Sequence, residues 1–122
     1  MQFMCLIYDD QKAWQEFSEE EQKAAMAQYF AFTEEARQAG VYVAADALQP
    51  VETATLVRLR DGEVLLTDGP YAETKEQLGG YYIFDVDSID EAVNWAAKIP
   101  SAQWGSIEVR PVVVFDREEV GA

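Results

Sequence analysis

The chain has 122 residues, of which 49% are apolar, and it carries 23 acidic against 9 basic side chains for a net charge of −14. This length and composition indicate one folded domain with a buried core, and they exclude a disordered chain. The acidic excess repels nucleic acid and anionic membrane surfaces, so we expect neither as a partner.

The chain contains no histidine and a single cysteine. The usual general base at neutral pH and the commonest metal ligand are therefore missing, which excludes Ser-His-Asp and Cys-His catalysis within one chain. We expect no cofactor and no metal, since only a cluster of carboxylates around a hard cation would remain as a metal site. A lone cysteine forms no internal disulfide, and the first apolar run is too short to span a membrane, so we expect a cytoplasmic protein.

In chain order, the first predicted element is a strand over residues 3–8 that is apolar on both faces and ends at Asp9-Asp10. Cys5 within it is interpreted as a small core residue. Residues 11–17 form a connection with a short helical turn, whose Trp14 and Phe17 pack on the core, line a pocket mouth or form an interface.

A long helix is predicted to start after Ser18, whose spacing to Glu21 is that of a capping box, and to end at Gly40. Helical spacing predicts its apolar stripe as Met26, Tyr29, Phe30, Thr33, Ala36 and Arg37. A second helix starts after Ser88 and ends before Pro100. Its predicted buried side chains are Ala92, Val93, Trp95, Ala96 and Ile99.

Further strands are predicted at residues 41–48, 54–59, 63–67, 81–86 and 107–115, followed by a polar, frayed tail. Asp61-Gly62 between two of them indicates a tight hairpin. The whole order is a βαββαβ plan with an extra β-hairpin. It predicts an α+β, ferredoxin-like fold, in which an antiparallel sheet carries two helices on one face.

The face of this sheet away from the helices needs a cover, because strand residues of both phases are apolar. Val112 and Val114 point to one side, and Val109, Val113 and Phe115 point to the other. Since the helices bury only one side, we expect a homodimer in which the sheet of a second copy packs on the first and forms a dimeric α/β barrel.

The best candidate for a site is the connection over residues 67–82, which joins two predicted strands. Gly69-Pro70 forces a turn, and Gly79-Gly80 lets the backbone bend or approach another group closely. Reactive side chains lie beside the first break or between the two, namely Asp68, Tyr71, Thr74 and Lys75.

One interpretation of this segment is an enzyme site that binds a small molecule. A buried Asp68 carboxylate would act as general acid or base, and Tyr71 or Tyr82 would donate a hydrogen bond to a developing oxyanion. An anionic substrate would be held by Lys75, Arg58 and Arg110. These roles permit proton abstraction beside a carbonyl, as in an isomerase or a lyase.

The other interpretation is structural and stays open at this stage. Asp68 then accepts hydrogen bonds from its own turn, and Tyr71 plugs the core or the dimer seam. The chain would be a non-catalytic homodimeric module that acts through a partner protein. An exposed apolar patch with Trp14, Phe17 or Trp104 would indicate that second class.

The run Asp68-Gly69-Pro70-Tyr71-Ala72-Glu73-Thr74-Lys75-Glu76, followed by Leu78-Gly79-Gly80-Tyr81-Tyr82, resembles the YCII-related family and specifically its DGPF branch. Residues 3–8, 57–62 and 105–111 look similar too, so the resemblance treats residues 1–122 as one domain. Tyr71 replaces the phenylalanine that names the branch.

This resemblance implies a dimeric α/β barrel without an established activity. Relatives of similar fold include lyase-like and isomerase-like enzymes that act on small cyclic substrates. Some YCII members are thought to use a histidine–aspartate pair, which cannot be carried over to a chain without histidine. Asp68 is the one motif position nominated for an acid/base role.

Overall fold

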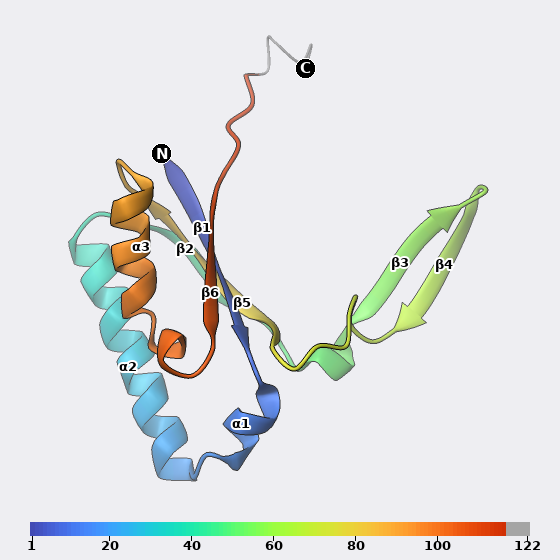
Figure 1. Ribbon diagram of the computed structural model, residues 1–122, viewed down its shortest axis with the longest axis horizontal. Helices are drawn as coiled ribbons and strands as arrows, with labels where there is room; N and C mark the ends of the chain where they lie inside the picture. The colour runs from blue at the N-terminus through green and yellow to red at the C-terminus, as the bar shows by residue number, and fades with distance from the viewer. Residues whose placement is uncertain (117–122) are drawn as a thin grey trace.

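The computed structural model describes residues 1–116, so the predicted tail lies almost wholly outside the described residues (Figure 1). The elements in chain order are β1 (Gln2–Asp9), α1 (Gln11–Glu16), α2 (Glu19–Gln38), β2 (Tyr42–Ala47), the 3-10 turn η1 (Val51–Thr53), β3 (Thr55–Arg60), β4 (Glu63–Asp68), β5 (Gln77–Asp85), α3 (Ile89–Lys98), the 3-10 turn η2 (Pro100–Gln103) and β6 (Ser106–Pro111).

Four strands form an antiparallel sheet in the order β2-β5-β1-β6, and β3 pairs with β4 in a separate hairpin. Figure 1 shows α2 and α3 together on one side of the four-stranded sheet. The predicted α+β fold of ferredoxin-like type, with an extra β-hairpin, is therefore confirmed.

The core lies between this sheet and the two long helices. Phe3, Cys5 and Ile7 alternate along β1 and are buried on the helix side, as a strand with period two requires. Phe32 of α2 packs edge-on against Phe84 of β5, with ring centroids 6.0 Å apart. Cys5 is a core residue, as predicted.

The predicted apolar stripe of α2 was partly wrong. Met26 and Phe30 are 45% and 71% exposed, whereas Ala25, Phe32 and Ala36 are buried. The buried residues are spaced seven and then four apart, so the face against the sheet is rotated from the predicted one. Val93 of α3, also predicted to be buried, is 49% exposed.

Two strand boundaries differ from the prediction. β5 starts at Gln77 and includes Gly79 and Gly80, which were placed before the strand. β6 ends at Pro111 rather than at residue 115. It pairs with β1, which begins at Gln2, and the Val112 N–H donates a bond to the Gln2 carbonyl, so residues 113–115 lie past the start of β1.

The predicted turn and first cap are confirmed. Asp61 and Gly62 have φ of 51° and 78°, the left-handed values that a two-residue hairpin turn requires. Ser18 accepts a bond from the Glu21 N–H, and the Glu21 carboxylate accepts one from the Ser18 N–H. Both capping-box bonds are thus present at the start of α2.

Two surfaces are left uncovered by the described residues. We call the β3–β4 hairpin, residues 55–68, the arm; it projects on the side of the sheet away from α2 and α3, and its two strands pack mainly on each other (Figure 1). We call the sheet face opposite the helices the open face, on which Met4, Leu6 and Tyr8 of β1 lie half-buried. The predicted second copy that would cover it stays a prediction. No helix within residues 1–116 is long and apolar enough to cross a membrane.

Candidate functional site

The residues predicted to form a site lie in different places. Asp68 ends β4 and is exposed, and the adjacent Gly69 N–H closes the base of the arm on the Ala54 carbonyl at 2.8 Å. Arg58 lies in the middle of the arm, and Lys75 is exposed in the connection after it. These side chains therefore do not converge, and their catalytic and binding roles stay predictions.

Tyr82 and Arg110 are also apart from Asp68. Tyr82 of β5 is buried in the core on the helix side, where its hydroxyl lies 2.7 Å from the Thr33 hydroxyl of α2. Arg110 pairs in register with Met4 on the open face, so it lies on the opposite side of the sheet from Tyr82.

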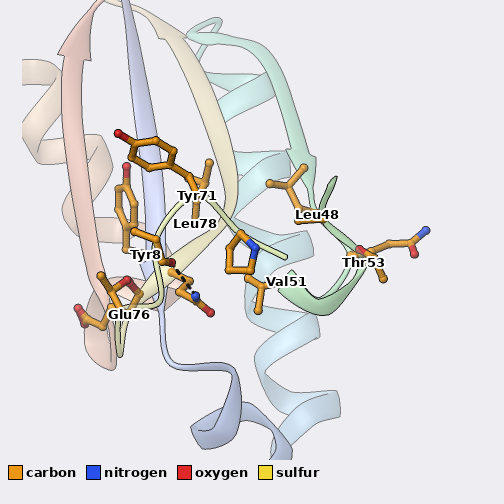
Figure 2. A pocket seen from close by; sticks show the side chains of 13 residues that line it. Tyr8, Leu48, Val51, Thr53, Tyr71, Glu76 and Leu78 are labelled. Atoms are coloured by element: carbon orange, nitrogen blue, oxygen red, sulfur yellow. Dashed lines mark hydrogen bonds between the residues drawn. The ribbon is translucent and has the colours of Figure 1, made fainter. Parts of the chain in front are cut away.

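Tyr71 lines a cavity of about 550 Å³ at the base of the arm, which we call the Tyr71 cavity. Figure 2 shows Tyr71, Leu78 and Tyr8 on one side of it and Leu48 and Thr53 on the other. The walls are mainly apolar, and the cavity lies on the side of the open face, because Tyr8 shares the phase of Met4 and Leu6 along β1.

A second pocket of about 300 Å³ lies on the helix side of the same end of the sheet. We call it the Asp9 pocket, because Asp9 continues the inward phase of Phe3, Cys5 and Ile7 and is half-buried there. Its volume is at the lower end of the range for small-molecule sites. Its aromatic lining consists of Trp14, Tyr29, Phe30, Tyr81, Tyr82 and Trp104.

The environment of Asp9 perturbs its ionisation. Burial first, and then the carboxylates of Glu76 and Asp10, raise the pKa of the Asp9 carboxyl, while a hydrogen bond with the Trp104 side chain opposes the rise. Asp10 itself has a structural task, since its carboxylate accepts the Lys12 N–H at 3.0 Å and caps α1. Asp9 is therefore a carboxyl group of raised pKa inside a cavity, a combination that is common among general acids and bases.

Hydroxyl groups surround the Asp9 pocket. The Tyr29 hydroxyl and the Ser101 hydroxyl form a hydrogen bond, and the rings of Tyr29 and Tyr82 stack with centroids 6.5 Å apart. Burial is the main cause that raises the pKa of the Tyr29 phenol, and the charge of Asp9 contributes to the rise, so the two groups interact electrostatically. Burial also raises the pKa of the Tyr82 phenol, so both phenols are neutral hydroxyls at neutral pH.

Glycines leave room for the Asp9 side chain. A Cβ at Gly79 would lie 3.3 Å from Asp9 Oδ1, and a Cβ at Gly105 would lie 2.4 Å from the Tyr8 carbonyl oxygen and 3.0 Å from Asp9 Cβ. The predicted close approach at Gly79-Gly80 is therefore present, although these residues extend a strand instead of bending it.

Sequence reasoning missed Asp9 by reading Asp9-Asp10 only as the end of a strand. The signal was its position two residues after Ile7, in the phase of the buried set. Trp14, for which three roles were open, lines the pocket and packs against Phe17 with centroids 5.7 Å apart. Phe17 packs at the same distance against Trp104. No three His, Cys, Asp or Glu side chains within residues 1–116 gather closely enough to hold a metal ion.

The fold and the pocket define a ferredoxin-like α+β protein with a cavity between the end of its sheet and its first long helix. The chain belongs to the YCII-related family, whose domain model matches residues 1–116. It is also similar to an uncharacterised protein of Rhizobium meliloti (strain 1021), with 35% identity over 122 residues that cover 98% of each chain. Neither similarity assigns an activity to this chain, and its membership of the DGPF branch stays a prediction.

Proposed function

We propose that this protein binds a small molecule in the Asp9 pocket and that Asp9 moves a proton on it, in an isomerisation or an elimination. The observation that carries the proposal is a half-buried carboxyl of raised pKa that lines an aromatic cavity beside neutral phenols. A carboxyl group of this kind exchanges protons with a carbon acid more readily near neutral pH than an ordinary aspartate does. We therefore propose Asp9, in place of Asp68, as the acid/base residue.

The proposed step abstracts a proton beside a carbonyl group. The C–H bond breaks, the proton goes to the Asp9 carboxylate, and the electron pair moves onto the carbonyl oxygen as an enolate. The Tyr29 hydroxyl donates a hydrogen bond to that oxygen, while the Ser101 hydroxyl donates to Tyr29 and orients it. Return of the proton to another carbon completes an isomerisation, and loss of a leaving group completes an elimination.

The pocket favours an uncharged ligand over an anionic one. None of the described residues that line it is a lysine or an arginine, and the basic Lys23 lies on a neighbouring groove instead. An anion would meet the Asp9 and Asp46 carboxylates, which line the pocket, and a chain of net charge −14. Arg58, Lys75 and Arg110, predicted to bind an anionic substrate, do not line this pocket, so we replace that prediction with an uncharged carbonyl compound.

A binding screen tests the proposal. Cyclic ketones and lactones are compared with ring carboxylates of the same size, and the indole N–H signals of the three tryptophans are followed by nuclear magnetic resonance. We expect the uncharged rings to shift Trp14 and Trp104, which line the pocket, and to leave the core residue Trp95 unmoved. Failure of every ring to shift Trp14 or Trp104, or equal shifts by the carboxylates, would contradict the proposal.

We also infer that the protein is a cytoplasmic homodimer. The open face supports the dimer, since an apolar sheet face without a cover is rare on a monomer. The unpaired, buried Cys5 suits a reducing compartment. The alternative of a non-catalytic module that binds a partner protein rests on exposed apolar residues such as Val113 and Phe115, which are 69% and 71% exposed.

A further inference from the structure

One face of the arm is apolar, and nothing in the described chain covers it. Cross-strand partners of an antiparallel pair point to the same face, and the register pairs Val57 with Leu66 and Leu59 with Val64. These four side chains therefore form one patch. Each of them keeps 61–66% of its surface exposed.

The opposite face of the arm mixes charged side chains with Leu56, Leu65 and Thr67. Arg58 pairs with Leu65 and Arg60 pairs with Glu63, so two arginines and a glutamate point away from the apolar patch. A hairpin that carries its arginines on one face and a continuous apolar patch on the other has the pattern of a layer that packs on a core through the patch. In the described chain no such core packs on the apolar patch.

The arm needs a packing layer that the described part of its own chain does not supply. A two-stranded hairpin alone is marginally stable in water, and it becomes stable when a third strand or another layer packs on it. The arm projects away from the body of the protein, so its own sheet and helices do not supply this layer (Figure 1).

The open face is the second uncovered apolar surface of the same chain. Met4 and Tyr8 of β1 lie on it, with Ile83 and Leu78 of β5 beside them in register. Two copies related by a two-fold axis would cover both surfaces with two identical contacts, arm on open face and open face on arm. A different protein docked on either surface would leave the other one exposed.

The size of the two surfaces also favours a second copy. A stable dimer interface takes about 20–30 residues from each partner. The arm has six residues in each strand, and only alternate ones face the patch, so the arm alone is too small. The arm together with the open face of a four-stranded sheet reaches the required size.

We propose that the arm of each copy lies with its apolar patch across the open face of the other copy and covers the mouth of the partner's Tyr71 cavity. This inference rests on the homodimer put forward above and names the contact that builds it. The Tyr71 ring, which is 82% exposed in a single chain, becomes covered in the assembly. The Tyr71 cavity is then completed by residues of the second subunit.

A pair of matched variants of the full-length protein tests the contact. Leu66→Glu changes the apolar patch, and Leu65→Glu makes the same change one residue away on the opposite face of the arm, beside Arg58. We expect Leu66→Glu to raise the dimer dissociation constant about 100-fold or more, since it buries a charge in the contact, and Leu65→Glu to change it by less than about threefold. Analytical ultracentrifugation measures both constants, and circular dichroism checks that each variant is folded.

Crosslinking identifies the surface that receives the arm. A Leu66→Cys chain is mixed with a Leu6→Cys chain and treated with a short bismaleimide linker; the natural Cys5 is buried and does not compete. We expect a crosslink between the two different chains. Efficient crosslinking of Leu66→Cys to itself would overturn the proposal, because the arms would then pack on each other.

The outcomes separate this inference from the homodimer. A wild-type protein that is monomeric would overturn both. A dimer that tolerates Leu66→Glu as well as Leu65→Glu, with no crosslink from Leu66→Cys to Leu6→Cys, would overturn the exchange of arms and leave the homodimer standing.

Discussion

The backbone of Gly79 lies against the carboxylate of Asp9, so closely that a Cβ at Gly79 would be 3.3 Å from Asp9 Oδ1. These residues are on neighbouring antiparallel strands, near the point where the β1–β5 register shifts between Ile7 and Tyr8. The glycine thereby leaves room for the one carboxylate that β1 directs into the pocket.

Alanine at the two glycines beside Asp9 should have unequal effects. Gly105→Ala places a Cβ 2.4 Å from the Tyr8 carbonyl oxygen, which is backbone and cannot move away, so we expect a loss of about 2–4 kcal/mol of unfolding free energy. Gly79→Ala meets a side-chain oxygen that can rotate, and should cost about 1 kcal/mol or less. Urea unfolding measures both, and an equal cost at the two sites would contradict this packing.

Replacing Asp9 should stabilise the protein in a pH-dependent way. Burial raises the pKa of Asp9 in the folded state, so the folded state holds the proton more tightly than the unfolded one. The contribution of Asp9 to stability is then fully present below its unfolded pKa and is lost as pH rises through its folded pKa. Asp9→Asn should therefore melt at a higher temperature than wild type near pH 7, and the difference should shrink below about pH 4.

The control for this prediction is Asp68→Asn at the exposed end of the arm, which should leave the melting temperature unchanged at both pH values. A lower melting temperature for Asp9→Asn near neutral pH would mean that Asp9 stabilises the fold as an ion, and its proposed role as a proton-transfer group would lose its support.

Much of the fold could be predicted from the sequence because its signals are local. Ser18 with Glu21 marks the start of α2, and Asp61-Gly62 marks the hairpin turn, since each depends on backbone groups within a few residues. The end of β6 could not be predicted in this way. Val113 and Phe115 have the composition of a strand, but whether they pair depends on where β1 begins.

The candidate site was harder to predict, because a pocket is made by residues that are distant in the sequence. Asp68 was predicted as a site residue because it lies among turn-forming residues. In the structure these residues form the base of the arm. Asp9 becomes notable only once Tyr29, Trp104 and Gly79, from three other parts of the chain, are brought around it.

Cys5 should be unreactive in the folded protein. Burial raises the pKa of its thiol to about 11, so the reactive thiolate is scarce at neutral pH, and the side chain is fully buried. We expect modification by a thiol reagent to follow global unfolding and to become fast in denaturant. An exposed Val93→Cys thiol on α3 provides the rapid control. Native Cys5 reacting as fast as that control would contradict its placement in the core.

The measurement that tests the central claim most directly is hydrogen–deuterium exchange at the carbon beside the carbonyl of the uncharged ring that binds best, followed by nuclear magnetic resonance in heavy water. We predict that wild type and Asp68→Asn accelerate this exchange by about 100-fold or more over buffer, and that Asp9→Asn does not. Exchange that survives in Asp9→Asn and is lost in Asp68→Asn would contradict the assignment of proton transfer to Asp9.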